Sequence, residues 1–377
     1  MATDTLPIGT PDIQATRQED LKVEVASQWK LMWWKLRKHK LAMISGVIVI
    51  LLYLGAIFCE FFSPSQPFKV YSNYVVAPPQ PVYFFLDGKF KPFVYGLSFT
   101  RDPKSLKRIW VVDKSTIIPI KFFAKGEKYK LWGLIPGDVH LIGPENPEEP
   151  FFLLGADKLG RDVLTRIIYS SRISLTVGLV GVFISLTIGI LLGGLSGLVG
   201  GWVDNLIQRI IEIFISIPTL PIWLALAAVV PIDWPALRVY FMISIILSFV
   251  GWTGMARVVR SKFLALREED FVLAARLDGC NRWRLITRHM VPSFLSHIIA
   301  SITLAIPGMI LGETALSFLG LGLRPPVVSW GVMLQDCQQV SVIANNPWMM
   351  FPGLAVVITV LALNFLGDGL RDAADPY

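Results

Sequence analysis

Charged side chains are scarce in this chain. Asp, Glu, Lys and Arg make up only 17% of the 377 residues, whereas hydrophobic residues make up 53%, and the mean hydropathy is +0.56. Soluble domains carry about a quarter charged residues. The composition therefore excludes a typical soluble fold and predicts an integral membrane protein.

Residues and motifs that usually mark catalysis or nucleotide binding are also scarce. The longest polar interval has a single histidine, His140, and no Gly-x-Ser-x-Gly motif accompanies it, so a membrane-anchored enzyme is disfavoured. The chain also lacks a Gly-x-x-x-x-Gly-Lys-Ser/Thr loop. It therefore cannot cradle ATP phosphates by itself.

Six apolar stretches are candidates for membrane spans, because a spanning helix needs about 20 mostly apolar residues. Prolines at 218, 221 and 307 should bend the third and fifth of them. The stretches are Leu41–Phe62, Ile173–Gly200, Leu206–Val230, Arg238–Ala256, His297–Leu319 and Trp348–Gly367.

Lysines and arginines indicate the orientation of these spans. They cluster before the first span and between the fourth and fifth spans, so both regions should be cytoplasmic. Six spans then place the N- and C-termini in the cytoplasm. The net charge of +7 is mostly this orientation signal, and no separate basic patch argues for nucleic acid.

The three cysteines have no metal-binding or redox spacing. Cys280 falls on the cytoplasmic side, so a disulfide could join only Cys59 and Cys337, which both lie toward the outside. The alternative is that these small thiols only pack.

The N-terminal region has two parts. Residues 1–20 are polar and suit a disordered lead, whereas Lys22–Lys40 mixes tryptophans with basic residues. The second pattern is typical of a helix in the inner membrane interface. A cytoplasmic extension of the first span is the alternative.

A polar interval, Ser63–Arg172, separates the first two spans and is placed outside by the topology. Residues 108–113 and 116–123 have the composition of strands, so a small β-rich domain is expected. Its many aromatic residues suit a core, with a stacking surface for sugars or peptides as the alternative. The interval ends in apolar and basic residues from Asp162 onward, which predict an amphipathic helix on the outer membrane surface.

A charged segment between the fourth and fifth spans predicts a short helix with a dockable side. Glu268, Glu269 and Asp270 suit the first turn of a helix, and Gly279 suits its end. A narrow face of mostly small residues follows from i, i+3, i+4, i+7 spacing, over Phe271, Ala274, Ala275 and Asp278. An ordinary amphipathic connector is the alternative.

Four blocks carry a family resemblance. The segment 268–292, with its Ala-Ala pair, Gly279 and Pro292, resembles the coupling motif of ATP-binding-cassette (ABC) importer permeases. Residues 154–169, 306–331 and 366–376 are similar to segments of the dipeptide, oligopeptide and nickel branch of that family. Val291-Pro292-Ser293 and Cys280 depart mildly from the pattern. The long outer insert departs more, and it leaves the substrate open.

The resemblance implies an all-α membrane protein with the six-helix fold of type I importer permeases and a β-rich extracytoplasmic insert between helices one and two. The implied ranges are a cytoplasmic tail with an interfacial helix (1–40), the first span (41–62), the insert (63–172), the permease core (173–368) with a coupling loop (257–290), and a cytoplasmic tail (369–377). The implied location is the bacterial inner membrane.

The resemblance also implies partners and a mechanism. Two ATPase subunits would bind ATP and Mg, and this chain would bind no cofactor. The helix from Glu269 to Gly279 would carry their motion into spans four and five. A second permease would complete the pathway, an extracytoplasmic binding protein would deliver substrate, and lipid would surround the spans. Peptides are the first expectation for the substrate and oligosaccharides the alternative.

Other transporter classes fit less well. An ion-coupled carrier usually has inverted repeats, and these unequal spans show none. An ABC exporter is disfavoured because no nucleotide-binding domain is fused. Two acidic residues, Glu212 and Glu313, lie nearest the interiors of the spans, where a charge is costly. Each therefore predicts a water-lined or paired position. For Glu313 we expect either a place near the pathway or a hydrogen bond that fixes span five against span four or a neighbouring subunit.

Overall fold

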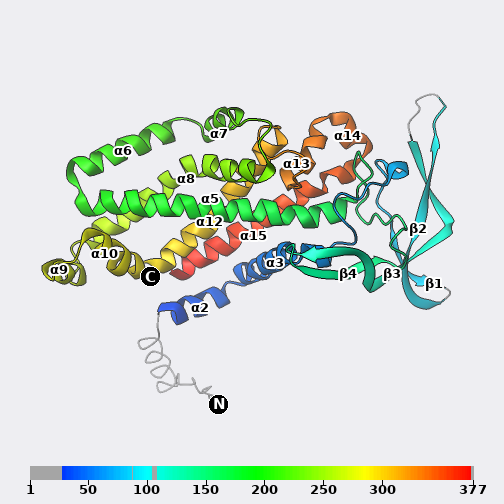
Figure 1. Ribbon diagram of the computed structural model, residues 1–377. Helices are drawn as coiled ribbons and strands as arrows, with labels where there is room; N and C mark the ends of the chain where they lie inside the picture. The colour runs from blue at the N-terminus through cyan, green and yellow to red at the C-terminus, as the bar shows by residue number, and fades with distance from the viewer. Residues whose placement is uncertain (1–27, 87, 104–107, 375–377) are drawn as a thin grey trace, which may run out of the picture.

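The computed structural model describes residues 28–86, 88–103 and 108–374, and it is mostly helical (Figure 1). Long helices lie along one another, a β-sheet lies at one end of them, and the short helix α9 lies at the opposite end (Figure 1). The long helices are α3 Lys40–Ile57, α5 Val163–Val199, α8 Ala236–Leu266, α12 Leu295–Phe318 and α15 Phe351–Ala374.

Shorter helices connect or flank the long ones, and the strands follow one another in the chain. The short helices are α2 Gln28–Lys38, α4 Cys59–Phe62, η1 Ser72–Tyr74, α6 Gly201–Ser216, α7 Thr219–Ala228, α9 Asp270–Leu277, α10 Arg282–Arg284, η2 Leu285–Met290, α11 Val291–Ser293, α13 Trp330–Gln335, η3 Asp336–Gln338, α14 Val340–Asn345 and η4 Pro347–Met350. The strands are β1 Val82–Leu86, β2 Lys89–Arg101, β3 Arg108–Leu131 and β4 Ile135–Pro144.

Within the described residues, five helical segments are long and apolar enough to cross a membrane. The sequence predicted a further span over Leu206–Val230, but that region is a pair of helices, α6 and α7, bent by 87°. Pro218 explains the break, because the residue before a proline avoids the helical conformation, and Ile217 is extended (φ −100°, ψ 133°). The number of spans is five, or six if the bent pair is one span.

Glycines let α5 and α8 approach closely. Gly189, Gly193 and Gly197 recur every four residues and so share one face of α5. A Cβ atom at Gly189 would lie 2.7 Å from the Cβ of Met255, and one at Gly197 would lie 2.6 Å from the Cβ of Phe263. Small residues at such spacing are the usual way in which membrane helices pack backbone against backbone.

Helix α5 corrects one prediction. The expected amphipathic helix from Asp162 to Arg172 is not a separate element, because α5 runs unbroken from Val163 to Val199. Its 37 residues span about 55 Å, well beyond the ~30 Å of a hydrocarbon core.

Arg166 and Arg172, in the first turns of α5, are not fully exposed to solvent either. Arg166 is buried, and Arg172 forms a bidentate ion pair with Glu60 of α4, at 2.7 and 2.5 Å. Ion pairs with Asp157 and Glu60 therefore replace the solvent contacts that the sequence pattern assigned to Arg166 and Arg172.

The expected β-structure is present as one antiparallel sheet in the order β1-β2-β3-β4. The two predicted strands, 108–113 and 116–123, both belong to the long strand β3. Between them the pairing with β2 shifts register, from Gly96 opposite Asp113 to Tyr95 opposite Ile117. The Asp113 side chain accepts hydrogen bonds there from the Ser115 amide and the Thr116 hydroxyl. These bonds give polar partners to residues of the bulge that are not paired with β2.

The aromatic residues of the insert divide into two groups. Tyr71, Tyr74 and Trp110 pack around the buried Phe152, as expected for a core. Others are exposed: Tyr83, Phe84, Phe85, Phe90, Phe122, Phe123 and Trp132. A core thus accounts for only part of the aromatic content.

The first and last helices of the described residues, α2 and α15, pack against each other. Helix α2 ends before His39, whose Nδ1 accepts a hydrogen bond from the Ala42 amide at the start of α3 (3.1 Å). Met32 and Leu36 of α2 pack with Ala373 of α15. Helix α15 continues to Ala374, past residue 368, at which the sequence placed the end of the permease core. Residues 22–27 of the predicted interfacial helix lie outside the described residues.

All three cysteines lie in the described part of the chain and are free. Cys59 and Cys337 are each buried, and the Cys337 thiol donates to the carbonyl of Met349 (3.2 Å). The thiols pack, and the disulfide between Cys59 and Cys337 does not form.

Candidate functional site

The short helix expected between spans four and five is present as α9, with Glu269 as its N-cap. Its end is a Schellman motif: the Gly279 amide donates to the carbonyl of Arg276, and the Cys280 amide donates to that of Ala275, both at 3.0 Å. Gly279 has φ +74°, a conformation in which a side chain is strained. Gly279 therefore defines the C-terminal end of this helix, while Glu269 begins it without a side-chain capping hydrogen bond.

The faces of α9 differ from the prediction at one residue. Ala275 was expected on the docking side, but it is only 9% exposed and packs inward with Val272. Their partners in the same cluster are Phe263 of α8 and Leu285 and Ile286 of η2. This face ties α9 to the membrane helices of its own chain.

The opposite face of α9 is apolar and exposed. Leu277 is 88% exposed, and Leu273 is also exposed. These two residues are spaced i, i+4, so they lie on one side of the helix, and Ala274 lies beside them. Exposed leucines at a charged end of a membrane protein are typical of a protein interface. The sequence analysis missed both leucines, although their spacing was a sufficient signal.

A polar network links α5, α6 and α8 close to α9 in the chain. Arg260 donates to both carboxylate oxygens of Asp204, each at 2.6 Å. Ser196, near the end of α5, donates to Asp204 as well. Arg260 lies on α8, the helix that leads directly into α9. The network therefore joins the α5–α6 corner to the base of α9.

Breaking this network should lower stability. Asp204→Asn removes the carboxylate that holds Arg260, so we expect the apparent Tm of the purified protein to fall by about 2 °C or more. The matched control is Glu212→Gln. Its ion pair with Arg209 (2.7 Å) has both side chains more than half exposed, so it should change Tm little. Equal shifts for the two variants would contradict the role of the network.

Glu212 itself lies on the surface of α6. The structure thus does not place it in the interior of this chain or between its helices, and it differs in this respect from Glu313.

Glu313 is buried in α12 and accepts hydrogen bonds from three serines. Ser317 and Ser329 donate to Oε1 at 2.8 Å each, and Ser174 donates to Oε2 at 3.3 Å. Ser174 belongs to α5, and Ser329 is the N-cap of α13. These hydrogen bonds therefore connect α12 to α5 and to the segment that follows α12, rather than to α8, the helix at the expected fourth span.

The hydroxyl oxygen of each of these serines also accepts a hydrogen bond from a backbone amide. The amides of Trp330, Leu323 and Val332 donate to Ser174, Ser317 and Ser329, at 3.2, 3.0 and 3.2 Å. A single carboxylate thus organises three backbone groups through three hydroxyls. Such a satisfied network rigidifies the part of the bundle that contains it.

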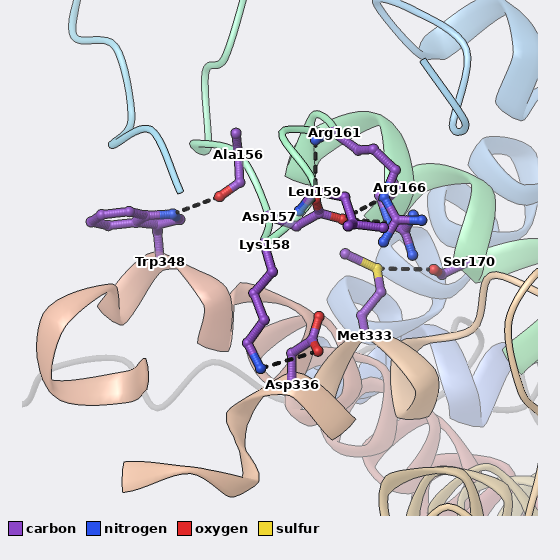
Figure 2. Close-up of polar contacts among 10 residues, drawn as sticks. All are labelled: Ala156, Asp157, Lys158, Leu159, Arg161, Arg166, Ser170, Met333, Asp336 and Trp348. Carbon is purple, nitrogen blue, oxygen red and sulfur yellow. Dashed lines mark hydrogen bonds and ion pairs between the residues drawn. The ribbon is translucent and has the colours of Figure 1, made fainter. Parts of the chain in front are cut away.

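The loop before α5 is held by Asp157 (Figure 2). One carboxylate oxygen accepts hydrogen bonds from the backbone amides of Leu159 (2.8 Å) and Arg161 (3.0 Å). The other oxygen accepts a hydrogen bond from the Arg161 guanidinium (2.7 Å), and the Arg166 guanidinium lies 3.5 Å from it. Gly155 and Gly160 turn this loop, with φ +83° and +76°.

The same loop docks on the region between α12 and α15 (Figure 2). The Trp348 indole donates to the carbonyl of Ala156 (3.1 Å), and Lys158 pairs with Asp336 (3.3 Å). Ser170 of α5 donates to the sulfur of Met333 (3.2 Å). Residues 154–162 therefore hold the start of α5 against α13, η3 and η4.

Comparison with known families agrees with this architecture. Residues 185–377 match the family described as binding-protein-dependent transport system inner membrane component. The chain belongs to this permease family. Residues 27–79 of the permease match the N-terminal transmembrane domain of oligopeptide transport permease C. The sheet, over residues 82–144, falls between the two matched segments.

Curated relatives of the permease align over about two thirds of its length. A dipeptide transport system permease protein of Bacillus subtilis is 40% identical over 223 residues, 59% of this chain and 68% of the relative. An oligopeptide transport system permease protein of Haemophilus influenzae is 40% identical over 241 residues, 63% and 75% of the two chains. A putative peptide permease protein of Brucella ovis is 37% identical over 251 residues, 66% and 81%.

Proposed function

We propose that this permease forms half of the translocation pathway of an ABC importer for di- and oligopeptides. A second homologous permease forms the other half, two ATPase subunits bind ATP and Mg and hydrolyse the ATP, and an extracytoplasmic binding protein delivers the substrate. The observation that carries the proposal is the exposed apolar face of α9 in a chain of this family. This chain binds no cofactor in the proposed assembly, and no nucleic acid.

In this proposal α9 is the docking element for an ATPase. The set from the sequence is Glu269, Asp270, Phe271, Ala274, Ala275, Asp278 and Gly279, to which Leu273 and Leu277 are added. Ala275 has a different role from the rest: with Val272 it couples α9 to α8 and η2. Motion of the ATPases is transmitted through that packed face because a close-packed core moves as a unit.

Topology follows from the two ends of the bundle. The sheet and α9 lie at opposite ends (Figure 1), and the basic residues around α9 favour the cytoplasm for that end. The sheet is then extracytoplasmic, both termini are cytoplasmic, and α6 with α7 forms the third of six spans. The domain ranges remain those proposed from the sequence, except that the α15 helix continues past residue 368.

The two acidic residues take different proposed roles. Glu313 fixes span five against span two through its serines. Glu212, with Arg209, lies on the open face of α6. A charged pair on a membrane helix is costly next to lipid, so this face is better suited to the pathway or to the second permease.

Peptides are the proposed substrate because the relatives named above are peptide permeases. Oligosaccharides are the alternative, since the exposed aromatics of the insert also suit sugar stacking. We expect uptake in vesicles that carry the whole assembly to be inhibited by mixed di- to hexapeptides and unaffected by mixed oligosaccharides. Inhibition by oligosaccharides and not by peptides would instead identify oligosaccharides as the substrate, and the proposed permease role would stand.

Omitting the ATPase subunits tests the permease role itself. Uptake should then fall to background, and this chain alone should neither bind nor hydrolyse ATP. Uptake driven by an ion gradient without the ATPases would indicate a secondary carrier and overturn the proposal.

A further inference from the structure

The hairpin formed by β3 and β4 returns from the sheet to the end of a membrane helix. Its tip contains Trp132, whose indole donates to the carbonyl of Ile57 in the last turn of α3 (2.8 Å). The Trp132 ring also lies 5.9 Å from that of Phe58, between centroids. In Figure 1 the hairpin ends beside α3. The tip therefore lies beside the last turn of the first candidate span.

The side chains around this tip are apolar and exposed. Leu134 is 79% exposed, and Ile135, Phe122 and Phe123 are exposed as well. Phe123 lies 6.2 Å from Phe61 of α4, between ring centroids. Leaving such a group of side chains in water is unfavourable by roughly 25 cal/mol for each Å² of apolar surface. A surface of this kind calls for an apolar partner.

Helix α3 indicates what that partner is. Its residues Ile50, Leu51, Leu54 and Ile57 are exposed along a candidate membrane span. The tip of the hairpin adjoins the C-terminal end of this apolar, exposed helix through the Trp132–Ile57 hydrogen bond. Tryptophan in this position, apolar on one side and hydrogen-bonded on the other, is typical of a membrane interface.

A cavity beside the tip is lined by side chains that could bind a lipid headgroup. Its volume is about 740 Å³, and its wall includes Lys128, Tyr129 and Lys130 of β3, with Glu60 and Tyr169 from the helices. Both lysines are exposed. Glu60 is already paired with Arg172. The remaining charged side chains on the wall are the two lysines and Asp138, so the cations outnumber the carboxylate there. Lysines next to an apolar tip suit lipid phosphates.

We propose that the β3–β4 hairpin rests in the interface of the bilayer, with Trp132, Leu134 and Ile135 among the lipid chains and a phospholipid headgroup beside Lys128 and Lys130. The leaflet is the outer one, which rests on the topology proposed above. A soluble protein partner fits less well, because the tip lies at the level of the last turn of a span. The hairpin would hold the insert at a fixed height over the membrane.

The chain offers a matched control at the other edge of the sheet. Phe85 of β1 is 70% exposed, and β1 lies farther from the membrane helices than the β3–β4 tip (Figure 1). Leu134→Cys and Phe85→Cys are made in the full chain with Cys280→Ser, since the other two cysteines are buried. Each variant carries a nitroxide label and is placed in nanodiscs of phosphatidylcholine and phosphatidylglycerol.

We expect the Leu134 label to collide several-fold more with oxygen than with a water-soluble nickel chelate, and the Phe85 label to show the opposite preference. Adding Lys128→Glu and Lys130→Glu should raise nickel access at Leu134. Equal nickel access at the two labels would overturn the proposal. So would a Leu134 label that becomes protected only when the binding protein is added. The measurement needs no transport, so its failure leaves the permease function standing.

Discussion

Leu277→Asp in α9 is expected to reduce substrate uptake at least about tenfold without lowering the amount of permease in the membrane. The Leu277 side chain is 88% exposed in this chain, so the carboxylate costs the isolated subunit little. At an interface with an ATPase it would be buried without a partner, at a cost of about 2 kcal/mol or more. A loss of 1.4 kcal/mol is already tenfold in binding. Uptake and substrate-stimulated ATPase activity of the assembled transporter are the measurements.

Ala275→Trp is the contrasting variant on the buried face of α9. Ala275 belongs to the same buried cluster as Phe263, Leu285 and Ile286, so a large ring there should lower the amount of folded permease itself. Leu277→Asp should leave that amount unchanged. Wild-type uptake and ATPase stimulation in Leu277→Asp would show that α9 is not the docking helix.

Glu313→Ala is expected to destabilise the permease by more than about 3 kcal/mol, because it leaves three buried serine hydroxyls without their shared acceptor. The three backbone amides bound to those hydroxyls would lose their alignment as well. We expect little folded protein in the membrane at 37 °C, and a lower apparent Tm in what remains. Membrane amount, thermal unfolding and uptake per folded molecule are measured together.

Conservative variants separate the two roles open to Glu313. Glu313→Gln keeps one acceptor oxygen and should lose less stability than Glu313→Ala, and Ser329→Ala should also lose less. A purely structural role predicts that uptake per folded molecule stays near the wild-type value in Glu313→Gln. Normal stability of Glu313→Ala combined with altered uptake would instead place this carboxylate in the pathway.

The membrane class, the approximate spans and helix α9 could all be predicted from the sequence. Each depends on interactions within a short segment. A bilayer selects runs of about 20 apolar residues whatever surrounds them, and Glu269 with Gly279 sets the ends of α9 through its own backbone. The coupling segment and the other matching blocks also led to the family, which the comparison confirmed.

Tertiary structure decided what these elements contact. Ala275 faces inward because Phe263, Leu285 and Ile286 lie on that side of α9, and periodicity in eight helical residues cannot name the buried face. The start of α5 is not a surface helix because Glu60, about 110 residues earlier in the chain, neutralises Arg172. The serines around Glu313 and the approach of Trp132 to Ile57 likewise join residues distant in sequence. Local patterns therefore determine where helices form, and long-range packing determines which side chains are left for lipid, for partners or for the interior.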